Sequence, residues 1–168
     1  HLPFFLLEPQ RRWIDRDVYE DAFGCVWRVG NIPHIEGHRL ASPSLRGYEW
    51  PDLTEDGYFR DAPEFLATHQ DFVTFCADAH GFYDRAWALR GLENLMVDLV
   101  LNPSFVHELF EALTEAHLGV VDRIAACGFE GIRFADDWGH QRGLLMGAER
   151  WRKFVRPGLE RILGRARA

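Results

Sequence analysis

The fold is decided by residues 102–137, which read NPSFVHELFEALTEAHLGVVDRIAACGFEGIRFADD. Asn102 is a good helix N-cap, Pro103 fits the first helical position, and Gly128 supplies a left-handed stop. A stripe of apolar residues at helical spacing connects these signals. It consists of Val106, Leu109, Phe110, Leu113, Val120, Val121 and Ile124. Residues 129–135 then predict a strand that ends at two aspartates, so a long helix leads directly into a buried strand.

The same alternation of strand and helix extends outward in both directions. Upstream, residues 62–68 predict a short helix with Asp61 as N-cap, and residues 72–77 form a near-continuous apolar run typical of a strand covered on both faces. Residues 82–100 predict a helix that is broken or bent near Gly91. Downstream, a glycine-containing loop leads to a helix from about residue 148, which Pro157 breaks or restarts.

This order of elements predicts a parallel α/β architecture. Periodicity does not separate an open doubly wound sheet from a barrel. In either case ligands bind beyond the carboxyl ends of the strands, which is therefore where a site is expected.

The first sixty residues carry weaker signals. Prolines and glycines recur throughout residues 1–60, which we interpret as a long irregular excursion that contains a hairpin over residues 19–29. Residues 61–168 carry the βα units. The chain opens with a strand-like segment instead of a methionine and stops while a helical pattern is still running. We therefore expect residues 1–168 to be a single incomplete domain that folds poorly alone, because an open half barrel exposes strand edges.

Composition excludes several classes of protein. The net charge of -7 argues against a general affinity for nucleic acid, and no run of 18 apolar residues predicts a membrane span. Neither a basic lead-in nor a cleavage site marks a secretory signal. Cys25, Cys76 and Cys127 are widely spaced and form no CxxC pair, which is typical of reduced thiols in a cytoplasmic protein.

The strongest candidate site is the run from Phe134 to Arg142, FADDWGHQR, at the predicted end of a strand. Two adjacent carboxylates repel each other, so proteins place them where a cation, a donor or a proton can use them. Asp136 and Asp137 are the candidate catalytic residues. Candidate substrate-binding residues beside them are Trp138, His140, Gln141 and Arg142. The competing interpretation is that one aspartate caps a loop or helix and the other is solvated.

A second candidate region follows the strand near residue 77. Arg85 can meet a carboxylate of a substrate, and Trp87 can stack on a planar one. The competing interpretation is a surface helix whose arginines pair with Asp84 and Glu93. His107 and His117 fall within the long amphipathic helix, where we expect them on its solvated side. No zinc signature, P-loop or GxSxG motif is present.

Two segments together resemble the uroporphyrinogen decarboxylase superfamily. One is IRFADDWG at residues 132–139, followed by ERWRKF at 149–154 and Pro157. The other is WALRGLENL at residues 87–95, followed by Asn102-Pro103. Their order and spacing over residues 80–160 are similar to those of the divergent members that carry an Asp-Asp-Trp-Gly loop and sit near corrinoid-linked methyltransferases.

The resemblance implies an enzyme built as part of a (β/α)8 TIM barrel, with its pocket at the carboxyl ends of the strands. It implies a small-molecule substrate, a corrinoid, a corrinoid protein as possible partner, and zinc held by residues outside this piece. A true decarboxylase would need no cofactor. The early arginine-rich motif of decarboxylases has no match here, since Gln10-Arg11-Arg12-Trp13 has the wrong spacing.

Two departures from the decarboxylase pattern bear on the reaction. Trp87 stands where decarboxylases carry tyrosine, and Asp137 stands where they carry serine. A second carboxylate is unfavourable for a polycarboxylate substrate and suits an amine, a thiol or a metal better. The resemblance therefore favours corrinoid-linked methyl transfer. The alternatives are decarboxylation of uroporphyrinogen in porphyrin metabolism, and a non-catalytic corrinoid or tetrapyrrole binder.

Overall fold

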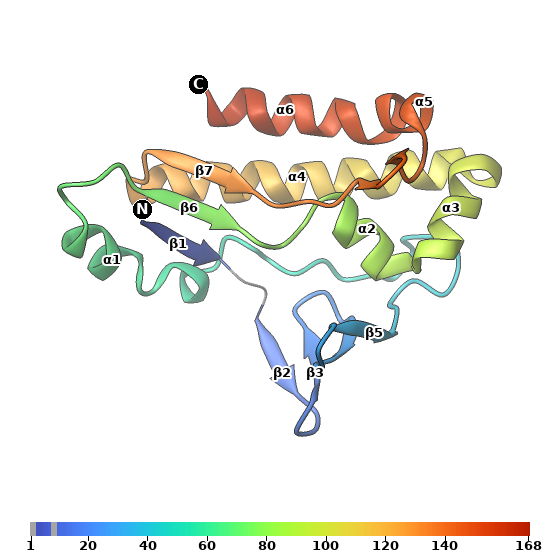
Figure 1. Ribbon diagram of the computed structural model, residues 1–168, viewed down its shortest axis with the longest axis horizontal. Coiled ribbons are helices and arrows are strands. Elements are labelled where there is room, and N and C mark those ends of the chain that lie inside the picture. Colours follow the sequence, from blue (N-terminus) through green and yellow to red (C-terminus); the bar gives the residue numbers. More distant parts are fainter. Residues whose placement is uncertain (1–2, 8–9) are drawn as a thin grey trace.

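A parallel sheet lies at the centre of the protein. The computed structural model describes residues 3–7 and 10–168, and in that part the parallel sheet has three strands, in the order β1 (Phe4–Leu7), β6 (Phe75–Asp78) and β7 (Gly131–Phe134). All three run in the same direction, so that Leu7, Asp78 and Phe134 share one end of the sheet. Figure 1 shows the three strands side by side, with their arrowheads pointing in the same direction.

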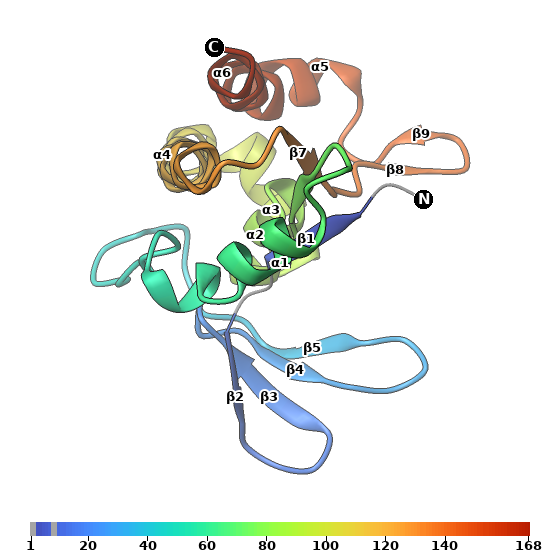
Figure 2. The same cartoon turned by 90° about the vertical axis from the view of Figure 1, so that its left-hand side faces the viewer.

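One long helix covers one face of this sheet. It is α4 (Pro103–Cys127), which ends at Gly128 in the left-handed conformation, with φ of 95°. The second long helix, α6 (Arg156–Ala166), packs along α4, and Figure 2 shows the two helices end-on beside the strands. The helix and stop predicted at residues 102–128 are therefore confirmed.

The remaining helices also follow the predicted boundaries. Helix α1 (Ala62–Thr68) begins after Asp61, and Gly91, with φ of 88°, separates α2 (Tyr83–Arg90) from α3 (Leu92–Leu101). A short 3-10 helix, Asp56–Phe59, precedes α1. After β7 come the strands β8 (Gly139–His140) and β9 (Gly143–Leu144), then α5 (Ala148–Arg150) and a π-helical turn, Trp151–Val155. Pro157 lies in the first turn of α6, so it restarts the helix.

Much of the segment expected to be irregular is a second sheet. Its antiparallel strands are β2 (Arg11–Trp13), β3 (Val18–Asp21), β4 (Val26–Arg28) and β5 (His34–Gly37), paired in chain order. The hairpin predicted over residues 19–29 is confirmed as the β3–β4 pair, which turns through Gly24 with φ of 77°. The expectation of an irregular excursion is wrong for these four strands, because strands of three or four residues are too short to show a period.

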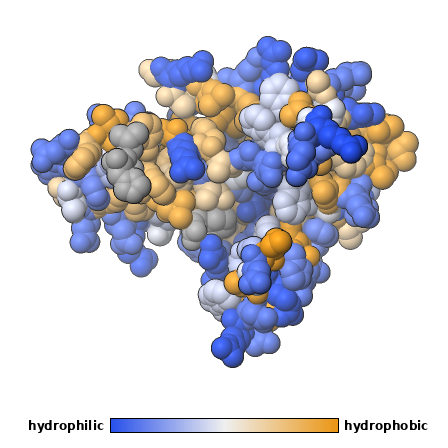
Figure 3. Space-filling model, viewed as in Figure 1, coloured by the Kyte–Doolittle hydropathy of each residue, from blue (hydrophilic) through white to orange (hydrophobic). Residues whose placement is uncertain are grey.

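The face of the parallel sheet that α4 leaves uncovered carries exposed apolar side chains. Phe5, Cys76 and Ile132 lie in one register row and pack into the core under the helices. The neighbouring row points the other way, and Phe4 and Leu6 are about half exposed there. Figure 3 shows this face as an apolar patch over the strands.

The mixed α/β class is confirmed, whereas the barrel stays a prediction, because the parallel sheet does not close on itself within the described residues. The apolar stripe of α4 is buried as predicted, but His117 on the same helix is buried too, so its expected solvated position is wrong. None of the described helices is both long enough and apolar enough to cross a bilayer.

A first prediction concerns the packing of α6 on α4. A Cβ at Gly158 would lie against Thr114 Oγ1 and 2.6 Å from Phe82 Cζ, whereas one at Gly164 would meet no described atom within 4 Å. We expect Gly158→Ala to lower the free energy of unfolding by about 1–2 kcal/mol, since overpacking outweighs the gain in helix propensity. The matched control Gly164→Ala should raise it by roughly 0.5–1 kcal/mol. Urea denaturation of both variants measures the difference, and equal stabilisation by both would contradict the packing.

Candidate functional site

A buried carboxylate fixes the turn that follows β6. Asp78 is the last residue of β6, and its side chain is fully buried. One carboxylate oxygen, Oδ1, lies 2.7 Å from Nδ1 of His80, and the other, Oδ2, lies 2.8 Å from Nδ1 of His117 on α4. The carboxylate therefore joins the carboxyl end of the sheet to the helix behind it.

The hydrogen bonds of His117 indicate that its imidazole is charged. Its Nδ1 faces the carboxylate of Asp78 and its Nε2 faces the carbonyl oxygen of Gly81 at 3.1 Å. Both partners only accept hydrogen bonds, so both ring nitrogens must carry a proton. Burial lowers the pKa of His117, but the charge of Asp78 and the hydrogen bonds outweigh it and raise the pKa above the usual value.

The ionisation of Asp78 follows from the same pairing. Burial raises the pKa of Asp78, while the charge of His117 and the hydrogen bonds from both histidines lower it further than burial raises it. The net result is a pKa well below the usual range for aspartate, so Asp78 and His117 form a buried ion pair.

Asp136 fixes the other end of the same turn. Its carboxylate accepts hydrogen bonds from the backbone N–H groups of Tyr83 and Asp84, both at 2.9 Å, and of Phe82 at 3.3 Å. It also accepts one from the indole N–H of Trp138. These N–H groups belong to the first turn of α2, which has no intrahelical acceptors for them. A carboxylate from the end of β7 thus caps the helix that follows β6.

A second buried ion pair attaches the antiparallel sheet to α2. Asp21, at the end of β3, pairs with the guanidinium of Arg85, and both side chains are at most 5% exposed. Asp21 also accepts a hydrogen bond from the indole N–H of Trp27 at 2.9 Å. The guanidinium of Arg85 donates to the carbonyl oxygen of His80 at 3.1 Å and lies over the ring of Phe23.

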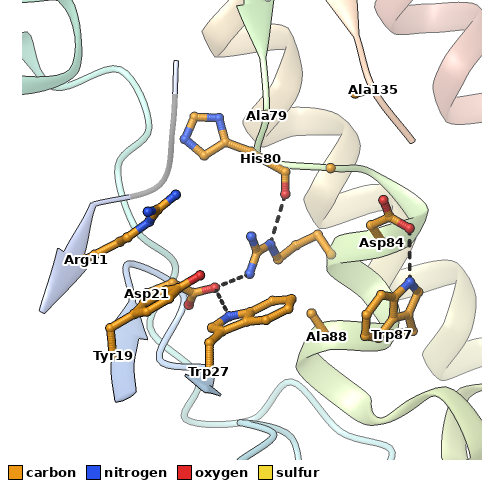
Figure 4. Close-up of a pocket in the computed structure, with 12 residues that line it drawn as sticks. Arg11, Tyr19, Asp21, Trp27, Ala79, His80, Asp84, Trp87, Ala88 and Ala135 are labelled. Atoms are coloured by element: carbon orange, nitrogen blue, oxygen red, sulfur yellow. Dashed lines mark hydrogen bonds and ion pairs between the residues drawn. The ribbon is translucent and has the colours of Figure 1, made fainter. Parts of the chain in front are cut away.

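These contacts surround a cavity of about 340 Å³ at the carboxyl ends of β6 and β7. Figure 4 shows its walls: the antiparallel sheet on one side and α2 on the other. Aromatic and charged side chains both line it. The aromatic ones are Tyr19, Trp27 and Trp87, and the ionisable ones are Arg11, Asp21, His80, Asp84 and Arg85. The volume lies at the small end of the range for ligand pockets.

Among the acidic residues that line the cavity, Asp84 has a raised pKa. Its Oδ1 accepts a hydrogen bond from the indole N–H of Trp87 at 3.0 Å (Figure 4). Burial, and then the negative charge of Asp136, raise the pKa of Asp84 to about 6. Sequence reasoning placed Asp84 only as a surface partner for arginine. The available signal was its position in the first turn after a parallel strand, but its burial depends on tertiary packing.

The structure brings together some of the predicted site residues. Arg85 and Trp87 line the cavity, and their role in substrate binding stays a prediction. Asp136 and Trp138 line a smaller, mainly apolar cavity of about 130 Å³ next to it. Asp137 is exposed on the loop after β7, where its carboxylate lies 3.4 Å from the backbone N–H of Gly139.

The other predicted residues lie apart from both cavities. His140, Gln141 and Arg142 are exposed on the β8–β9 hairpin and line neither cavity. Figure 2 shows this hairpin projecting beyond the sheet, on the side away from α4. Their role in substrate binding stays a prediction.

Neither expected cofactor can be placed on named residues. Within residues 3–7 and 10–168, no group of three or more His, Cys, Asp or Glu side chains is arranged to hold a metal ion. A cavity of about 340 Å³ is also too small to enclose a corrinoid macrocycle. The described residues therefore do not fit either group, and the chemistry below is assigned only to the side chains present.

Comparison with known proteins gives no relative. No family model, no curated protein and no solved structure matches the chain.

The buried ion pair gives a prediction on stability. Asp78→Asn leaves the imidazolium of His117 buried without a counterion, so we expect the free energy of unfolding to fall by about 3–5 kcal/mol at pH 5.5. The control is Asp71→Asn, because Asp71 is exposed in the turn before β6; this variant should change stability by less than about 0.5 kcal/mol.

The pH dependence of this loss distinguishes an ion pair from a neutral hydrogen bond. The raised pKa of His117 makes its contribution complete below the unfolded value, about 6.5, and lost as pH rises through the folded pKa. The lowered pKa of Asp78 makes its contribution complete above about 4 and lost as pH falls through the folded pKa. The difference between wild type and Asp78→Asn should therefore be largest from about pH 4 to 6.5 and shrink in alkali. A difference independent of pH in urea denaturation would contradict the ion pair.

Proposed function

We propose that the chain is part of a uroporphyrinogen decarboxylase-superfamily (β/α)8 barrel whose pocket binds the small methyl donor or acceptor of corrinoid-linked methyl transfer, with zinc and the corrinoid held outside the described residues. The observation that carries this proposal is the cavity at the carboxyl ends of β6 and β7, with aromatic walls and a group of carboxylates. In such barrels the active site lies at this end of the strands, where loops from successive strands meet.

The exposed face of the parallel sheet supports the barrel. In a (β/α)8 barrel, helices cover the outside and the opposite row of each strand points into a packed interior. Here α4 covers one face, while Phe4, Leu6 and Phe75 carry the apolar row of the other. These apolar side chains are what a packed barrel interior requires, and Arg133, in register with Ala77, is the charged residue on the same face of β7.

The charges around the cavity favour methyl transfer over uroporphyrinogen decarboxylation. The negative charges of Asp136 and Asp137 both raise the pKa of Asp84. Like charges in a pocket are unfavourable for a substrate with many carboxylates. Arg85, the predicted anion-binding residue, is already paired with Asp21. The cavity volume also suits a small methyl donor or acceptor better than a tetrapyrrole.

The side chains present would bind and orient such a substrate. The indole N–H groups of Trp27 and Trp87 are held by Asp21 and Asp84, so both rings are fixed along the cavity wall. Asp136 would act by positioning α2, because its carboxylate is occupied by backbone donors. Asp137 would approach the ligand from the loop after β7.

Methyl transfer to a reduced corrinoid tests the proposal. The purified full-length protein is incubated with free cob(I)alamin and small methyl ethers, methylamines or methyl thioethers, and the absorbance of methylcobalamin is followed. We expect methylcobalamin to form only with protein and with one class of donor. Release of carbon dioxide from uroporphyrinogen would support the decarboxylase instead. Binding of a corrinoid or tetrapyrrole without any turnover would support the non-catalytic binder.

Asp137→Asn gives a residue-level prediction. We expect turnover to fall at least about tenfold, because a charge beside the reacting groups is lost, while stability stays unchanged since the side chain is exposed. Asp71→Asn is the control, because Asp71 is equally exposed at the amino end of β6, away from the cavity. Turnover by Asp137→Asn that equals that of the control would remove Asp137 from the site.

A further inference from the structure

Three aspartates beside the cavity have no cationic partner. The fully buried aspartates of the described residues each face a cation, namely Asp21 with Arg85, Asp78 with His117 and Asp98 with Arg90. Asp84 and Asp136 are partly buried and Asp137 is exposed, and none of them lies within ion-pair distance of a described cationic side chain. Their charges lie near one another, because Asp136 and Asp137 both raise the pKa of Asp84. Like charges without a counterion favour the binding of a cation.

Of these three residues, Asp84 lines the cavity of about 340 Å³. Its Oδ1 accepts a hydrogen bond from the indole of Trp87 at 3.0 Å, and the backbone N–H of Asp137 donates to the same carboxylate. Both donors are neutral, so they fix the carboxylate without cancelling its charge. A cation in the cavity would supply the missing counterion and leave both hydrogen bonds in place.

Two indoles form a corner beside this carboxylate. Trp27 and Trp87 both line the cavity, with ring centroids 6.3 Å apart and ring planes at 62° to each other. Carboxylates bind both indole N–H groups, so the polar edge of each ring is already used (Figure 4). The face of an aromatic ring attracts a cation, and this wall already holds one such contact, since the guanidinium of Arg11 lies 5.1 Å from the ring centre of Tyr19.

An unused hydrogen-bond acceptor is a second, independent feature of the cavity. The side chain of His80 is fully buried and belongs to the cavity wall. Its Nδ1 is bound to Asp78, and its Nε2 has no hydrogen-bond partner among the described residues. Because Nδ1 donates its proton to the carboxylate, Nε2 is left as the acceptor of the ring, and a buried acceptor without a donor is unfavourable. Figure 4 shows His80 on one side of the cavity and Asp84 with Trp87 on the other, so a ligand that spans it can supply the donor.

An organic cation fits this site better than a metal ion. Within residues 3–7 and 10–168, no group of three or more His, Cys, Asp or Glu side chains is arranged to hold a metal. The oxygens of Asp136 are occupied by backbone N–H groups and by the indole of Trp138. An alkylammonium ion needs no set of ligands, because indole faces contact the alkyl groups over which its charge is spread.

We propose that this cavity binds a small alkylammonium ion that carries a hydrogen-bond donor. The charged end lies against the carboxylate of Asp84 and the indoles of Trp27 and Trp87. The donor group faces Nε2 of His80 across the cavity. This inference rests on the proposed function and deepens it, because it names the chemical class of the small methyl donor or acceptor.

Three probes that differ in one feature each test the site in the purified full-length protein. Choline carries a cation and a hydroxyl group, neohexyl alcohol replaces the nitrogen of choline by carbon, and ethyltrimethylammonium lacks the hydroxyl. By isothermal titration calorimetry, we expect choline to bind at least about tenfold more tightly than neohexyl alcohol, and more tightly than ethyltrimethylammonium. Equal binding of choline and neohexyl alcohol, or no saturable binding of choline, would overturn the proposal. Equal binding of choline and ethyltrimethylammonium would remove His80 from the site.

Variants of the wall then locate the bound cation. We expect Asp84→Asn to weaken the binding of choline at least about fivefold and to leave that of neohexyl alcohol nearly unchanged, since only the counterion is lost. Trp87→Leu should weaken the binding of choline, whereas Trp87→Phe, which keeps an aromatic face, should restore most of it. Asp71→Asn is the control, because Asp71 is exposed and does not line the cavity. An Asp84→Asn variant that melts like wild type and binds choline as tightly would overturn the proposal.

The cation site and the proposed function fail in different experiments. Saturable binding of choline without methylcobalamin from any donor would support the cation site and contradict methyl transfer. Methylcobalamin formed from a methyl ether or thioether, in a protein that does not bind choline, would support methyl transfer and overturn the cation site.

Discussion

The rest of the structure depends on the ion pair between Asp78 and His117. A carboxylate taken out of water costs several kcal/mol unless it is paired and hydrogen-bonded. Asp78 is fully buried, so its position at the end of β6 requires an imidazolium within reach, and α4 supplies one. The same imidazolium donates to the carbonyl oxygen of Gly81. One interaction therefore fixes the sheet end, the long helix and the turn from which α2 begins.

Aspartates at the carboxyl ends of β6 and β7 together fix the turn that leads into α2. Asp78 from β6 holds it from behind, and Asp136 from β7 caps the first N–H groups of α2. Because both carboxylates are saturated with donors, they are well suited to structure and poorly available to a ligand. Asp84, in the first turn of the same helix, accepts hydrogen bonds from the indole of Trp87 and from the backbone of Asp137. Of the adjacent acidic pair, Asp136 holds the start of α2 and Asp137 is exposed, so the catalytic role of the pair stays a prediction.

The helices of residues 61–168 can be predicted from the sequence because caps, glycine stops and apolar periodicity are local features. The helix over residues 103–127 follows from its caps and its apolar stripe, and the break at Gly91 follows from a glycine between two helical patterns. The antiparallel sheet was missed apart from one hairpin, since its strands are too short for periodicity. His117 was misplaced because its partner Asp78 is 39 residues away in sequence. The pKa of Asp84 depends on burial and on Asp136, neither of which is visible in a linear pattern.

Two of the buried ion pairs near the cavity neutralise their own charges, so the ionisation of Asp84 matters more for a ligand. Arg85 is neutralised by Asp21, and Asp78 is neutralised by His117, so these buried groups add little net field. Burial and the charge of Asp136 raise the pKa of Asp84 to about 6, so this wall gains negative charge as pH rises through that value. A ligand with many carboxylates would meet repulsion at this wall as pH rises, whereas a neutral or cationic small molecule would not. The fixed indoles of Trp27 and Trp87 offer flat faces to such a molecule. Both features are those that the proposed small, uncharged or positively charged substrate would require.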